Sequence, residues 1–218
     1  SLVLLVGLVF INLAVLFVLP WQSASAVWGG SGLLIIWLSL QLQQRASFVF
    51  GVLLQVFGGL AFLLAAPLLL AQLDSEGLRP LAHAGFWTPA VLAIAALIGA
   101  WRVQRVAGGE QAAILPVLSL ARLSQVLLVW GAGWWSLALV GEIFRFAAPE
   151  SRAPLLLLAI AASVALSTLL AARLQWRALA LLCTLLVPAA ALTLLLVWHL
   201  AYHPAADFGW LGLGALFV

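Results

Sequence analysis

Apolar stretches of membrane-spanning length, separated by short polar corners, fill this chain from one end to the other. A helix needs about 20 apolar residues to cross the hydrocarbon core of a bilayer. A soluble fold is excluded because only 7% of the residues are charged, against roughly 25% in a soluble domain. The sequence therefore predicts an all-α fold, a polytopic transmembrane helical bundle.

Polar residues and prolines divide the chain into eight apolar stretches, and we expect 1–218 to form a single transmembrane helical region. Seven full spans cover about 2–20, 24–42, 48–72, 87–106, 120–146, 155–172 and 178–202, and an incomplete eighth covers 208–218. The last stretch would reach only about 16 Å as a helix, which is too short to cross a bilayer. We therefore expect the chain to be a fragment of a longer protein, with further spans elsewhere in that protein.

Three corners carry specific expectations. Residues 21–23 are expected to form a tight turn after Pro20. Thr88 and Pro89 have the residue types of a helix cap and a first helical position, so the fourth span is expected to begin there. Residues 149–154 are expected to form a polar connection between two spans.

Arginine placement predicts the orientation in the membrane. If the corners alternate sides, one side carries a single acid, Glu110, and six arginines: Arg45, Arg102, Arg105, Arg122, Arg173 and Arg177. Because short Arg-rich loops stay in the cytoplasm, we expect the N-terminus to be cytoplasmic. The arginines are scattered singly at span ends, so we expect the lipid bilayer, and no nucleic acid, as a partner.

Small and polar residues recur along two neighbouring spans. Ser25, Gly29 and Gly32 follow one face of the second span, and the third span carries Gly51, Gln55 and Gly59 at intervals of four. Small residues let helix backbones approach closely in lipid. We expect both stripes to pack against other helices.

Candidate catalytic side chains concentrate on the outer side. They are Glu142, His199, His203 and Asp207. The two histidines are four apart, so on one helix they could share a metal ion, but Pro204 ends the helix there and interfacial histidines are the preferred interpretation. Glu142 and Arg145 have the spacing of a plain helix-end ion pair. We therefore expect no metal and no cofactor.

Two tryptophans fall in the middle of the fifth span. Trp130 and Trp134 share a face beside Gly131 and Gly133, which predicts a helix contact, with one wall of a pocket as the alternative.

The opening stretch resembles a known family. Trp28, Gly32 and Trp37 are similar to the Trp-x-x-Glu-Gly-x-x-x-x-Trp pattern of domain-of-unknown-function family 2339, which comprises large bacterial membrane proteins. The basic corner 173–177 and the stretch HPAADFGWLG at 203–212 also resemble stretches of that family. Ser31 stands where the pattern has its Glu, so a charged role at this position is not expected. The resemblance implies a long, multi-pass, uncharacterised inner-membrane protein of the cell envelope, with a periplasmic protein partner.

Three functions remain open at this point. The first is a scaffold or partner-binding component of a cell-envelope system, which needs no catalytic set. The second is a transporter or channel, for which Gln55 offers a polar position inside a span. The third is a membrane-embedded enzyme acting on an envelope lipid or glycan at the periplasmic face, using the four candidate residues above. The scaffold is preferred over the enzyme because the sequence contains no established catalytic motif.

Overall fold

Helices make up all the regular secondary structure in the described part of the chain, which is residues 2–71, 78–107, 119–184 and 191–192 of a computed structural model. In order they are α1 (Leu2–Val18), α2 (Trp21–Leu42), α3 (Arg45–Ala71), α4 (Ala84–Ala107), α5 (Leu120–Phe146) and α6 (Pro149–Leu174). A further helical stretch covers 177–184. Five of these helices, α2 to α6, are long and apolar enough to cross a membrane. The all-α membrane class is confirmed, and the count of seven spans stays a prediction.

The turn expected at 21–23 was wrong. Pro20 has an extended backbone, with φ −55° and ψ 146°, and α2 begins directly at Trp21. The amide of Ala24 donates to the carbonyl of Pro20 at 2.9 Å, so the helical hydrogen bonding starts at the proline itself. A single extended proline is enough to redirect the chain, and no separate turn is needed.

Two prolines lie inside helices rather than before them, which corrects two further expectations. α4 begins at Ala84 and contains Pro89, while the carbonyl of His83 accepts hydrogen bonds from the amides of Phe86 and Trp87. α6 begins at Pro149 and contains Pro154, so 149–154 is helix and not a connection. Pro149 is favoured at the first helical position because its missing N–H would have no helical partner there.

Two short corners use glutamine in the left-handed conformation. Gln43 ends α2 and Gln175 ends α6, each with φ 53°. The amides of Gln44 and Trp176 donate back to Ser39 and Ala171, which closes the last turn of each helix. Only two residues, 43 and 44, separate α2 from α3, so these two helices are tied together as a hairpin.

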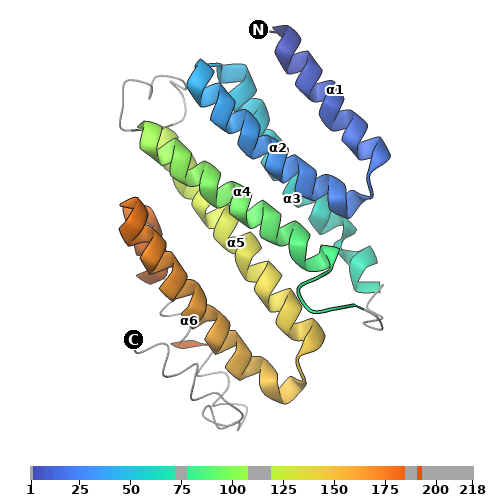
Figure 1. Ribbon diagram of the computed structural model, residues 1–218, viewed down its shortest axis with the longest axis vertical. Helices are drawn as coiled ribbons and strands as arrows, with labels where there is room; N and C mark the ends of the chain where they lie inside the picture. The colour runs from blue at the N-terminus through green and yellow to red at the C-terminus, as the bar shows by residue number, and fades with distance from the viewer. Residues whose placement is uncertain (1, 72–77, 108–118, 185–190, 193–218) are drawn as a thin grey trace. The chain divides into compact units, whose positions relative to one another are not determined.

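The chain divides into two compact units, Ser1–Ala138 and Leu139–Val218. In unit 1, α2 packs most extensively against α3 and then against α4, and α1 lies at the edge against α2 (Figure 1). Unit 2 contains the end of α5, all of α6 and the stretch 177–184. Within it the Arg152 guanidinium donates to the carbonyls of Phe144 and Ala147, both at 3.2 Å, and so caps the end of α5.

Candidate functional site

The small-residue face of α2 lies against two helices. A Cβ atom added to Gly32 would lie 2.8 Å from the carbonyl oxygen of Gly51 on α3. One added to Gly29 would lie 2.8 Å from a methyl group of Leu92 on α4. The Ser25 carbonyl is 3.0 Å from the Cβ position of Gly58 on α3. At Gly32 and Gly58 the close neighbour is backbone, so α2 and α3 approach this closely because glycine lacks a Cβ, whereas Gly29 meets the flexible end of the Leu92 side chain.

The stripe on α3 turns away from α2 along its length. Gly51 and Gln55 face α2, but a Cβ on Gly59 would meet the rings of Trp130 and Trp134 of α5 at 2.5 and 2.7 Å. Residues four apart rotate by about 40° around a helix, so two such steps move the face by about 80°. Gly58 lies seven residues after Gly51 and is therefore only about 20° from it around the helix. Gly58, rather than Gly59, continues the contact with α2.

Gln55 is a polar side chain enclosed at the junction of α2, α3 and α4. It is 1% exposed, and its Nε2 donates to the carbonyl of Ala95 on α4 at 3.3 Å. Its Oε1 is buried and has no hydrogen-bond donor among the described residues. Gly32 and Gly99 provide the space for this side chain, because their Cβ positions lie 2.8 and 3.7 Å from it.

A second polar contact joins α1 to α2. The Ser31 hydroxyl donates to Oδ1 of Asn12 at 2.9 Å, and the Trp28 indole N–H donates to the Asn12 carbonyl at 3.1 Å. Asn12 is 5% exposed and its Nδ2 donates to the carbonyl of Leu8. Ser31, which stands where the resembling family has Glu, therefore serves as a donor between helices.

Four arginines gather at one end of unit 1, where α2 and α4 end and α3 and α5 begin (Figure 1): Arg45, Arg102, Arg105 and Arg122. The Arg102 guanidinium lies 4.3 Å from the centre of the Trp37 ring, and Arg105 lies 4.8 Å from that of Trp101. The first of these cation–π contacts joins the end of α4 to α2, and the second lies within α4. The described residues of unit 1 include no Asp or Glu.

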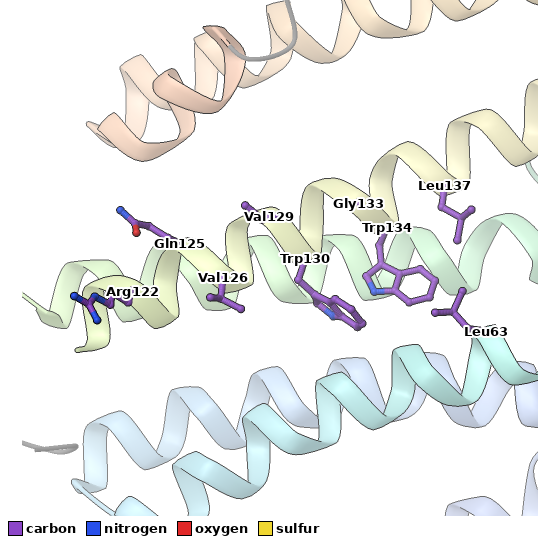
Figure 2. Close-up of a pocket in the computed structure, with 9 residues that line it drawn as sticks. All are labelled: Leu63, Arg122, Gln125, Val126, Val129, Trp130, Gly133, Trp134 and Leu137. Carbon is purple, nitrogen blue, oxygen red and sulfur yellow. The ribbon is translucent and has the colours of Figure 1, made fainter. Parts of the chain in front are cut away.

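A groove of about 840 Å³ runs along α5 on the side near Leu63 of α3. Figure 2 shows Trp130 and Trp134 projecting towards the α3 helix that carries Leu63, with Arg122 and Gln125 at one end of the groove. The two indole rings are edge to face, with centroids 5.6 Å apart. Gly131 faces α4, where a Cβ would lie 2.9 Å from Leu97, while Gly133 has open space around its Cβ position and lines the groove. The tryptophan face is thus both a helix contact and a groove wall.

Of the four candidate catalytic residues, the structure describes Glu142 alone. His199, His203 and Asp207 lie outside the described residues. Glu142 and Arg145 are both half-buried near the end of α5 in unit 2. No group of three His, Cys, Asp or Glu side chains that could hold a metal occurs among the residues that the structure describes.

Asn12 was missed in the sequence analysis, and a pocket beside Trp130 and Trp134 was only the less favoured alternative there. Asn12 could have been identified because it is a lone Asn in the middle of an apolar stretch of 17 residues. The groove combines α5 with Leu63 of α3, and no pattern within one helix reveals such a pairing.

Replacing Asn12 by leucine is expected to loosen α1 from α2, because the hydrogen bond with Ser31 is lost. A double-mutant cycle of Asn12→Leu with Ser31→Ala, measured by reversible unfolding in bicelles, should give a coupling of about 0.6 kcal/mol, the average for hydrogen bonds between membrane helices. The bond from Trp28 to the Asn12 backbone survives both changes and serves as the internal reference. A coupling of zero would show that the Asn12–Ser31 contact does not hold α1.

Comparisons with protein-family models, with curated proteins and with solved structures find no match for this chain. The resemblance to family 2339 therefore stays a prediction.

Proposed function

We propose that this protein is a membrane-embedded scaffold that holds partner helices of a bacterial cell-envelope system. The close backbone contacts inside unit 1 carry this proposal. Gly32 against Gly51, and Gly58 against the carbonyl of Ser25, bring the backbones of α2 and α3 close together at those points. A rigid, closely packed set of helices suits a part that positions other proteins.

The outer face of α1 is the surface we propose for partner binding. Phe10 is 68% exposed and Phe17 is 83% exposed, and they are seven residues apart, on one side of the helix. Such a face can accept a helix of another polypeptide or a further span of the same longer protein.

The orientation belongs to the same proposal. The four arginines at one end of unit 1 favour a cytoplasmic position for that end in a bacterial inner membrane. The N-terminal end of α1 then also faces the cytoplasm, since α1 runs antiparallel to α2 (Figure 1). Labelling single-cysteine variants from either side of intact inner-membrane vesicles tests this, with Cys183 replaced by serine.

Transport is the second candidate because of one observation. The Oε1 atom of Gln55, which has no donor among the described residues, lies deep between α2, α3 and α4, where a polar path would need such a group. The scaffold is favoured because Gly32 and the neighbouring backbones enclose this side chain, and its amide bonds to α4 instead of lining an opening.

Crosslinking and flux measurements distinguish these functions. A photo-crosslinking amino acid at Phe10 or Phe17 should capture one and the same polypeptide in native membranes, and the fully buried position Phe48 should not. Asn12→Leu should reduce the capture, because it loosens the helix that carries both positions. Purified protein in liposomes should pass no ions or small solutes. If the protein does pass solutes, and the Gln55→Leu variant does not, the transporter function is supported and the scaffold function is rejected.

A further inference from the structure

One face of α5 combines an apolar trough with a cationic end. Its members recur at intervals of three and four residues, which places them on one side of the helix. They are Arg122, Gln125, Val126, Val129, Gly133 and Leu137. All are exposed, with Val126 and Val129 both at 63%.

The floor of the trough is closely packed. Trp134 is buried, and its ring packs edge to face with both Trp130 and Phe62, at centroid separations of 5.6 and 5.7 Å. Both indoles rest on Gly59 of α3, which has no side chain to displace them. Gly133 has no atom within 4 Å of its Cβ position, so the trough is open at this point.

Among the described residues of unit 1, no acidic side chain lies near the cationic end of the trough. Unit 1 has no Asp or Glu among those residues, and Glu110 lies outside them. Arg122 and Gln125 supply guanidinium and amide donors one turn apart. Phosphate oxygens are the natural acceptors for such donors, and Arg at a membrane surface attracts anionic lipid.

The length of the trough matches one leaflet. From Arg122 to Gly133 the helix rises by about 16 Å, and half of the hydrocarbon core is about 15 Å thick. A headgroup at Arg122 therefore places the end of its acyl chain near Gly133.

We propose that this groove binds one anionic glycerophospholipid. The phosphate accepts hydrogen bonds from Arg122 and Gln125, and an acyl chain lies over Trp130 and along Val126, Val129 and Gly133. Charge complementarity selects the headgroup, because a zwitterionic lipid brings its own cation to the arginine-rich end. This site is independent of the scaffold function, which rests on the face of α1 and the contacts of α2.

The test uses the full chain in nanodiscs of phosphatidylcholine with a minor fraction of phosphatidylglycerol. Photoactivatable phosphatidylglycerol, with its reactive group in the acyl chain, should label peptides from 122–137, as identified by mass spectrometry. Arg122→Gln should lower the preference for phosphatidylglycerol over phosphatidylcholine about fivefold, and Arg122→Lys should keep it. Gly133→Leu should abolish labelling of the groove, because the new side chain fills the trough.

Gly141→Leu is the matched control. Gly141 is also on α5 and also has nothing within 4 Å of its Cβ position, but it does not line the groove. It should leave labelling unchanged, and thermal unfolding should show that both glycine variants are folded. Labelling spread evenly along the exposed helices, or equal labelling by both headgroups, would overturn the proposal. So would a crosslink showing that a polypeptide segment fills the groove.

Discussion

Replacing Gly32 by alanine should already destabilise unit 1, and replacing it by leucine should prevent α2 and α3 from closing together. The added Cβ atom would lie 2.8 Å from the carbonyl oxygen of Gly51 and from Cγ of Gln55, and 3.2 Å from the Gln55 amide nitrogen. Two of these three atoms belong to the α3 backbone and cannot move aside without moving the helix. Overpacking of this kind lowers the free energy of unfolding by about 1–3 kcal/mol. Reversible unfolding in bicelles measures it.

Gly30 provides the matched control on the same helix. It has nothing within 4 Å of its Cβ position. Gly30→Ala should therefore leave stability unchanged or raise it by roughly 0.5–1 kcal/mol, the difference in helix propensity between the two residues. Equal effects at Gly30 and Gly32 would show that the close contact of α2 with α3 does not exist in the membrane.

The second large effect is expected at Gly131. Leucine there should separate α5 from α4, because the Cβ atom would lie 2.9 Å from Cγ of Leu97 and 3.1 Å from the carbonyl oxygen of Ala93. The expected loss is again about 1–3 kcal/mol of unfolding free energy. It should be accompanied by a change in tryptophan fluorescence, since Trp130 and Trp134 are neighbours of Gly131 on α5.

A variant at Gly133, two residues after Gly131, tests the proposed lipid binding independently of helix packing. Gly133→Leu should leave the unfolding free energy of the protein nearly unchanged while it blocks the groove, because its Cβ position is open. A loss of stability in Gly133→Leu as large as that in Gly131→Leu would contradict the assignment of the two glycines to different faces.

Composition and the length of the apolar stretches were sufficient to predict the class. The fifth expected span, 120–146, has the same bounds as α5. Two helix starts were predicted too late in the chain because of prolines. Pro89 and Pro154 each have the residue type of a helix start, yet each lies inside a helix. A proline near a helix start interrupts little of the helical hydrogen bonding, so sequence alone does not distinguish the two positions.

Contacts between helices were harder to predict than the helices themselves. Small residues at 29 and 32, or at 58 and 59, identify faces capable of close approach, but not the neighbour that each face meets. Gly58 faces α2 and Gly59 faces α5, although they are consecutive. The difference comes from a rotation of about 100° per residue together with the positions of three other helices.

The two-residue corner between α2 and α3 has a consequence for how the protein is assembled. Its most extensive interface joins helices that follow each other directly in the chain, so the interface closes with almost no loss of loop entropy. We therefore expect the Gly32–Gly51 contact to form before the contacts of later helices, with α4 packing next at Leu92 and α5 at Gly131. This order predicts that assembly starts from the α2–α3 hairpin and that the groove on α5 is completed only after α5 has joined it.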